Sequence, residues 1–133
     1  MKRGDVVVVA ARGAYTGKPR PALVVQSDLF NATHQSVTLC PITSDCLDAP
    51  LFRIPLPPGE RTGLKSASQI MVDKIVSVPS SAVTSRIGRC DARELEAAAD
   101  ALRQWLELRA CEFFADLLRA PPNHLSRRCG SST

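Results

Sequence analysis

The sequence predicts a mainly β fold, a small antiparallel barrel or half-barrel with one helix packed on it near the C-terminus. Short β-branched or alternating stretches, separated by turn residues, fill the first two thirds of the chain. A single stretch with apolar side chains at helical spacing follows them. The last dozen residues have neither pattern and are expected to be disordered.

The expected strands are residues 5–11, 21–26, 36–42, 51–56 and 68–78. The first is a continuous β-branched run, which indicates a strand buried on both faces. Ser27 has the position of an N-cap for a turn or short helix. Pro41 inside the third stretch indicates an edge strand or a bulge, because proline cannot donate to a ladder.

The helix is expected to begin after Asp91, which has the spacing of an N-cap with a reciprocal carboxylate at Glu94. Apolar positions continue to about Leu118. We therefore expect one domain over residues 1–118, with the barrel at about 3–90, the helix at about 91–118 and a tail at 119–133. The helix carries three aromatic side chains, more than one packed face needs: Trp105, Phe113 and Phe114. We expect them to pack in the core, and a dimer or partner surface is the alternative.

Composition excludes several functional classes. No apolar run is long enough to span a membrane, and the N-terminal residues lead into a strand without a cleavage pattern. Five cysteines without a C-x-x-C pair, and only two histidines, argue against a disulfide framework or a metal site. We expect a cytoplasmic protein without a metal or other cofactor and without membrane contact.

Charge is unevenly distributed along the chain. Residues 1–90 hold 11 basic and six acidic side chains, residues 91–118 hold three and seven, and residues 119–133 hold three and none. A basic body favours a polyanionic partner, and a solvated surface is the alternative at this magnitude.

The stretch Lys18-Pro19-Arg20-Pro21 places a guanidinium between two prolines, where a loop meets an apolar strand. Proline restricts the backbone on both sides, and arginine offers forked donors for a phosphate or carboxylate. An anion site and an ordinary surface arginine are equally compatible with this local pattern.

Thr43 and Ser44 come directly after the third strand. If the second and third strands pair as antiparallel neighbours, Arg20 and Thr43 lie at the same edge of the sheet. A cation and a hydroxyl together there can bind a phosphate and stabilise a pentacoordinate phosphorus. A hydroxyl-rich turn is the alternative interpretation of these residues.

The chain resembles the MazF/PemK-type toxins, which are ribosome-independent messenger-RNA endoribonucleases of bacterial toxin–antitoxin pairs. The resemblance covers roughly residues 3–110. Its signatures occur in family order: Gly4-Asp5-Val6-Val7, Lys18-Pro19-Arg20-Pro21-Ala22-Leu23-Val24-Val25, residues 27–31, Cys40-Pro41-Ile42-Thr43-Ser44, residues 63–74 and Gly88.

The resemblance implies an SH3-like barrel, a homodimer and a cognate antitoxin. It also implies metal-independent cleavage of single-stranded RNA by attack of a ribose 2′-hydroxyl on the adjacent phosphate. Arg20 and Thr43 match the catalytic arginine and threonine of the family. Ser68 matches a serine before the late strand, and Lys74 stands where many relatives have glutamine.

Further residues are candidates for binding the substrate. Tyr15 is the chain's one tyrosine and lies in the loop before Arg20, where a base can stack on it; a solvated loop side chain is the alternative. Four cationic side chains are candidates for contacts along an RNA backbone, and solvated surface charge is the alternative: Lys18, Arg53, Arg61 and Lys65. Ser44 adds a hydroxyl beside Thr43.

Two alternatives to a ribonuclease remain. One is a gyrase-poisoning toxin of the same fold, which the mid-helix position of Trp105 and the Ser-Ser-Thr terminus disfavour. The other is an inactive relative that binds RNA or protein, which the presence of both Arg20 and Thr43 disfavours.

Overall fold

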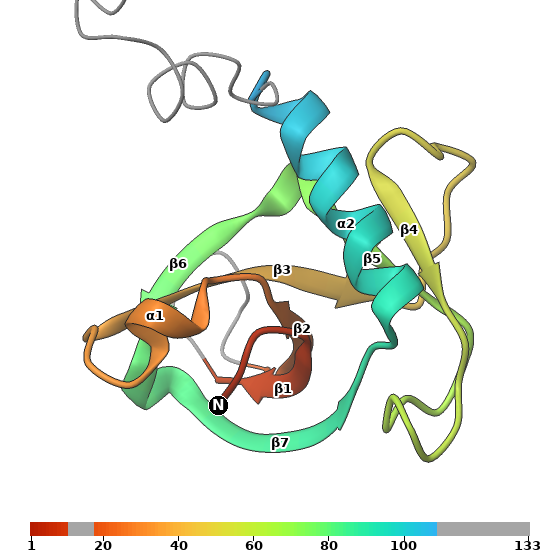
Figure 1. Ribbon diagram of the computed structural model, residues 1–133. Coiled ribbons are helices and arrows are strands. Elements are labelled where there is room, and N and C mark those ends of the chain that lie inside the picture. The colour runs from red at the N-terminus through yellow and green to blue at the C-terminus, as the bar shows by residue number, and fades with distance from the viewer. Residues whose placement is uncertain (11–17, 109–133) are drawn as a thin grey trace, which may run out of the picture.

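The computed structural model describes residues 1–10 and 18–108. Its elements are β1 (Asp5–Val9), β2 (Arg20–Val24), α1 (Asp28–Asn31), β3 (Ser36–Thr43), β4 (Arg53–Leu56), β5 (Ser68–Met71), the 3₁₀ helix η1 (Val72–Lys74), β6 (Val76–Pro79), the 3₁₀ helix η2 (Ser80–Ala82), β7 (Val83–Arg89) and α2 (Ala92–Trp105). The strands curl around a common centre, and α2 lies beside β4 and the 3₁₀ helix η1 (Figure 1). The predicted fold class is confirmed.

All strand pairs are antiparallel, in the order β4-β5-β3-β2-β1-β7. β3 is the central strand: β2 pairs along one edge, and β5 and β6 share the other. The expectation that Pro41 marks an edge strand or bulge is therefore wrong. Pro41 is tolerated because it falls between Leu39, the last residue paired with β6, and Ile42, the first paired with β5.

The expected single strand over residues 68–78 is also wrong, because η1 divides it into β5 and β6. Both halves pair with β3, and the three residues of η1 have no partner there. Val72 is buried in the core, and the Asp73 carboxylate lies 3.3 Å from Arg53 Nε. Burial and this ion pair explain why the backbone turns at η1 and does not continue as strand.

Strand β7, which pairs with β1, is not predicted by the sequence pattern. Only Val83 and Ile87 among its side chains are even partly buried, so its apolar signal is weak. The other strands agree with expectation to within about two residues at each described end, although β4 begins at Arg53 and not at 51. Ser27 caps α1 as expected, since its hydroxyl accepts a hydrogen bond from Leu29 N–H.

Strands β1 and β2 are buried on both faces. The β-branched composition of residues 5–11 predicted this for β1. Alternate residues of β1 enter different clusters: Val6 packs in the cluster beneath α2, and Val7 in the cluster on the opposite face. Leu23 and Val24 of β2 divide in the same way. The sheet therefore holds the start of β2 and the end of β3 in a rigid framework.

The N-terminus of α2 has the predicted capping box. Asp91 accepts from Glu94 N–H, and the Glu94 carboxylate accepts from Asp91 N–H, each at 2.8 Å. Trp105 is half exposed, and its ring packs 5.7 Å from that of Phe52, so it joins the core only in part. No helix in the described ranges is long and apolar enough to cross a membrane.

The expected extension of α2 to Leu118 is wrong, because the helix ends at Trp105. Glu107 has a left-handed φ of 56° and donates to Gln104 C=O, and Leu108 donates to Arg103 C=O. These paired bonds form a Schellman motif, which terminates a helix locally even where the apolar spacing continues. Phe113, Phe114 and the tail at 119–133 lie outside the described residues.

Gly88 brings β7 against the segment that follows β4. A Cβ on Gly88 would lie 2.3 Å from the Thr62 carbonyl carbon and 2.4 Å from Arg61 O, both backbone atoms. We expect Gly88→Ala to lower the free energy of unfolding in urea by about 1–3 kcal/mol through overpacking. Ser85→Ala, at an exposed position of the same strand, should change it by less than about 0.5 kcal/mol.

Candidate active site

A pocket of about 240 Å³ opens where β2 begins and β3 ends. Ala22 lies opposite Pro41 in the ladder, so Arg20 and Thr43, each two residues further out, share one edge of the sheet. Strand pairing led us to expect this meeting, and both side chains line the pocket. Among the described residues, the lining consists of Lys18, Pro19, Arg20, Pro21, Ile42, Thr43, Ser44, Leu64, Lys65, Ser66 and Ser68.

The charged side chains of this lining are all cationic. Lys18 and Arg20 approach from the start of β2, and Lys65 comes from the segment before β5. All three are exposed, and no aspartate or glutamate is among the described lining residues. The pocket is therefore suited to a phosphate group, for which the forked guanidinium and the two ammonium groups supply donors.

The two buried or half-buried hydroxyls of the pocket use their protons differently. Thr43 Oγ1 accepts a 3.0 Å hydrogen bond from Asp45 N–H, which leaves its own proton able to donate to a ligand oxygen. Ser68 Oγ instead donates to Ser66 C=O at 2.9 Å. A phosphate oxygen needs a donor, so Thr43 is the better placed of the two to bind one.

Six of the predicted site residues meet in this pocket: Lys18, Arg20, Thr43, Ser44, Lys65 and Ser68. Lys74 is exposed on η1 and does not line it. Tyr15 lies outside the described residues.

Arg53 is the clearest departure from the expected RNA track. It is only 8% exposed and pairs with Asp73 inside the fold, so it cannot reach a backbone phosphate on the surface. Arg61 is likewise engaged, because both of its terminal nitrogens donate to the Glu94 carboxylate, at 2.7 and 3.0 Å. In both cases the carboxylate partner lies far along the chain and was not visible in the local sequence.

Leu64 and Ser66 line the pocket although the sequence analysis did not select them. Leu64 is buried and gives the pocket an apolar wall. Both residues fall in the block 63–74, which carried part of the family resemblance. The resemblance of this block was the only sequence feature that pointed to these two residues, and it did not distinguish pocket residues from their neighbours.

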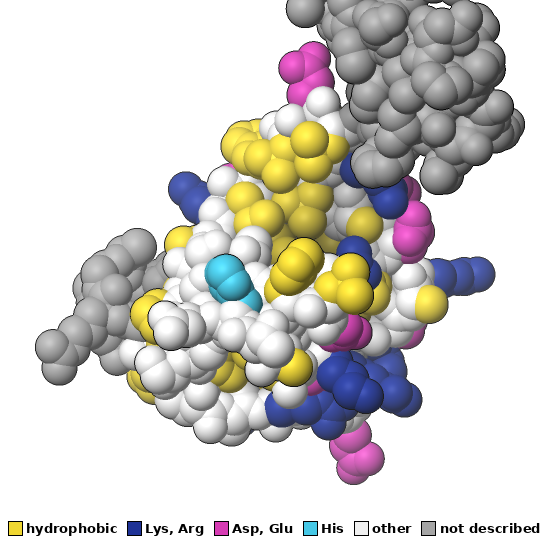
Figure 2. All heavy atoms as spheres, turned by 60° about the vertical axis from the view of Figure 1, so that its left-hand side comes forward, with side chains coloured by type: hydrophobic (Ala, Val, Ile, Leu, Met, Phe, Trp, Pro, Cys, Tyr) yellow, Lys and Arg dark blue, Asp and Glu magenta, His cyan; other side chains and the backbone are white. Residues whose placement is uncertain are grey.

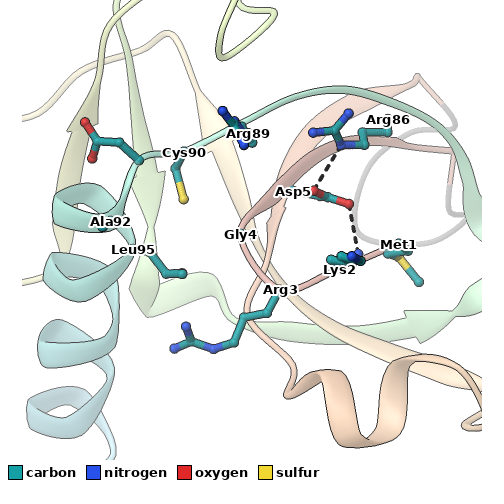
Figure 3. A pocket seen from close by; sticks show the side chains of 11 residues that line it. Met1, Lys2, Arg3, Gly4, Asp5, Arg86, Arg89, Cys90, Ala92 and Leu95 are labelled. Atoms are coloured by element: carbon teal, nitrogen blue, oxygen red, sulfur yellow. Dashed lines mark hydrogen bonds and ion pairs between the residues drawn. The ribbon is translucent and has the colours of Figure 1, made fainter.

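A larger cavity, of about 580 Å³, lies near the N-terminus of the chain and of α2 (Figure 3). Its charges are of both signs, and Arg86 Nε is 3.0 Å from Asp5 Oδ1. Asp91, also in the lining, caps α2. Because carboxylates face this cavity, it suits a phosphate less well than the smaller, wholly cationic pocket.

Residues 2–106 match the family model described as PemK-like, MazF-like toxin of type II toxin–antitoxin system. The chain belongs to this family. The resemblance found in the sequence motifs is thereby confirmed.

Among curated members of the MazF-like family, the chain is 54% identical over 89 residues to the probable endoribonuclease MazF of Mycolicibacterium smegmatis. The match covers 67% of this chain and 81% of that protein. The prediction of a MazF-type endoribonuclease is thus confirmed at the level of the family.

Two solved structures show that the fold is shared. The Mycobacterium tuberculosis toxin MazF-mt6 superposes with a TM-score of 0.69 at 21% identity, covering 80% of this chain and 99% of that one. The MazE–MazF structure from Deinococcus radiodurans gives 0.68 at 22%, covering 82% and 97%. At these identities the likeness establishes the MazF-like fold.

Proposed function

We propose that this MazF-type toxin cleaves single-stranded messenger RNA at selected sequences, without a metal ion, by attack of a ribose 2′-hydroxyl on the adjacent phosphate. The observation that carries the proposal is the meeting of Arg20 and Thr43, from neighbouring strands, in one cationic pocket. The pocket's size of about 240 Å³ suits a phosphate and part of its nucleotide.

The reaction needs an in-line displacement and stabilisation of charge on phosphorus. The 2′-oxygen forms a bond to phosphorus and its proton passes to water, while the bond from phosphorus to the 5′-oxygen breaks. Arg20 stabilises the charge of the phosphorane, and the departing 5′-oxygen takes a proton from water. Arginine is not the general base, because guanidinium hardly deprotonates.

Thr43 complements Arg20 at the same phosphate. Its hydroxyl proton donates to a non-bridging oxygen, while one lone pair of the same oxygen accepts from Asp45 N–H. Lys18 and Lys65 attract the RNA backbone, and Ser44 adds a donor at the pocket rim. Ser68 orders the wall of the pocket through its bond to Ser66 C=O.

A homodimer and an inhibitory antitoxin are part of the same proposal. Large apolar side chains remain exposed at the end of α2 (Trp105, Leu106 and Leu108) and on the loop before β4 (Leu47 and Leu51). Figure 2 shows hydrophobic side chains gathered at the upper end of one face. Patches of this kind mark protein interfaces. A solved structure of this fold is an endoribonuclease from Mycobacterial species in complex with its cognate antitoxin. We propose that an acidic antitoxin segment covers the cationic pocket here.

Cleavage in the presence of EDTA tests the mechanism. Purified protein is incubated with a long single-stranded RNA in EDTA, and the ends of the fragments are sequenced and analysed by mass. We expect cleavage at a defined motif, with a 2′,3′-cyclic phosphate or its hydrolysis product on one fragment and a 5′-hydroxyl on the other. Activity that vanishes with EDTA and returns with magnesium would contradict the proposal, as would intact RNA together with DNA gyrase trapped on DNA.

A further inference from the structure

Gln69 of β5 holds the loop that follows the pocket residue Thr43. Its side-chain oxygen accepts from Leu47 N–H at 3.0 Å, and its side-chain nitrogen donates to Leu47 C=O at 2.8 Å. The amide thus pairs with the backbone of a loop residue as a neighbouring strand would. Gln69 is also the ladder partner of Thr43, so the clamp begins beside the pocket.

The clamped loop, residues 44–48, has few other attachments. In the described part of the chain its remaining hydrogen bonds are the one from Asp45 N–H to Thr43 Oγ1 and a weak 3.8 Å contact from Cys46 Sγ to Ala67 C=O. Most of its side chains are exposed, so burial does not hold it either. The position of this loop therefore depends mainly on Gln69.

We propose that Gln69 is a positioning residue for RNA cleavage, which acts through Thr43. By fixing Leu47, Gln69 keeps the loop folded so that Asp45 N–H points at Thr43 Oγ1 and the threonine proton remains directed to the substrate phosphate. Gln69 itself is absent from the pocket lining and does not touch the phosphate. This inference rests on the proposed function, since it assumes that Thr43 binds the scissile phosphate.

The proposal requires a donor and an acceptor on the same side chain. Glutamine has both, whereas a glutamate carboxylate can only accept and would face the Leu47 carbonyl with a like partial charge. A protonated carboxyl again has one donor and one acceptor. The substitution Gln69→Glu is therefore expected to interrupt the clamp at neutral pH and to restore it in acid.

The first test compares two glutamines whose side-chain amides both donate and accept. The Gln26 side chain joins α1 to β3, because it accepts from Thr38 N–H and donates to Asn31 Oδ1, at the far end of β2 from Arg20. On a short RNA containing the cleaved motif, we expect Gln69→Ala to lower kcat roughly tenfold to a hundredfold with KM changed less than about twofold. Gln26→Ala should lower the melting temperature to a similar degree and leave kcat within twofold; a kcat within twofold for Gln69→Ala overturns the proposal.

The second test asks whether Gln69 acts through Thr43. In a Thr43→Ala background, single-turnover cleavage should be no slower when Gln69→Ala is added. A further loss as large as in the wild-type background overturns the proposal while leaving the active site in place. Full activity of Thr43→Ala alone would instead overturn the assignment of the site, so the two failures are distinguishable.

The third test uses pH. For Gln69→Glu, kcat relative to wild type at the same pH should rise as pH falls towards the ordinary carboxyl pKa of about 4.3. Gln69→Ala has no titrating group at this position, so its ratio should stay flat. A flat ratio for Gln69→Glu would contradict the hydrogen-bonding role assigned to the amide.

Discussion

Arg20→Ala should lower the single-turnover rate of RNA cleavage by about 100- to 1,000-fold, because one preorganised donor is lost from the developing charge on phosphorus. The loss should fall on kcat more than on KM, since the interaction strengthens as the phosphorane forms. Arg20→Lys keeps the charge without the planar fork, and we expect an intermediate rate. Rates on a short RNA and the circular dichroism of each variant are the measurements.

Arg89→Ala is the matched control for Arg20→Ala. Arg89 is an exposed arginine of β7 that lines the larger cavity and not the active-site pocket, and its removal changes the net charge equally. Its cleavage rate should stay within a few-fold of wild type at moderate ionic strength. If the two variants lose activity equally, Arg20 contributes only general attraction of RNA, and its assigned role is wrong.

Asp73→Asn should lower the free energy of unfolding by about 3–5 kcal/mol, because it leaves the Arg53 guanidinium buried without its counter-charge. The two side chains are 9% and 15% exposed. Arg53 Nε and Asp73 Oδ1 face each other at 3.3 Å, but their alignment does not make a hydrogen bond, so the attraction is electrostatic. Burial, and then the Asp73 charge, raise the pKa of the Cys40 thiol to about 12, so this charge also acts within the core.

The double substitution Arg53→Met with Asp73→Leu separates the charge from the packing. Replacing a buried pair by apolar side chains of similar volume is often neutral or better, so most of the lost stability should return. Because Arg53 is outside the pocket, this variant should also keep its RNA cleavage rate. Urea unfolding and cleavage of a short RNA measure the two effects, and a folded variant that no longer cleaves would place Arg53 on the RNA track after all.

The parts of the fold that sequence predicts well are those set by local chemistry. The Asp91–Glu94 capping box depends on two residues three positions apart, and the sequence shows it directly. The meeting of Arg20 and Thr43 required one further assumption, that consecutive strands pair. That assumption holds because β2 and β3 are joined by a short connection through α1.

The parts that sequence did not predict depend on distant partners or on backbone conformation. In the sequence, Arg53 has the pattern of an ordinary strand arginine, and only the folded structure shows that Asp73 of η1 lies beside it. The end of α2 is set by the left-handed backbone of Glu107, for which the residue type gives little sign. The Gln69 clamp joins β5 to a loop 22 residues earlier in the chain, and neither segment indicates the contact alone.

Removal of a single 2′-hydroxyl tests the central claim most directly. A short RNA with the cleaved motif, and the same RNA with one deoxyribose at the nucleotide before the cut, are incubated with the protein in EDTA. The account predicts rapid cleavage of the first and none of the second at that bond, because the attacking oxygen is missing. Equal cleavage of both, with a 5′-phosphate on the new end, would show that water attacks the phosphate and would contradict the account.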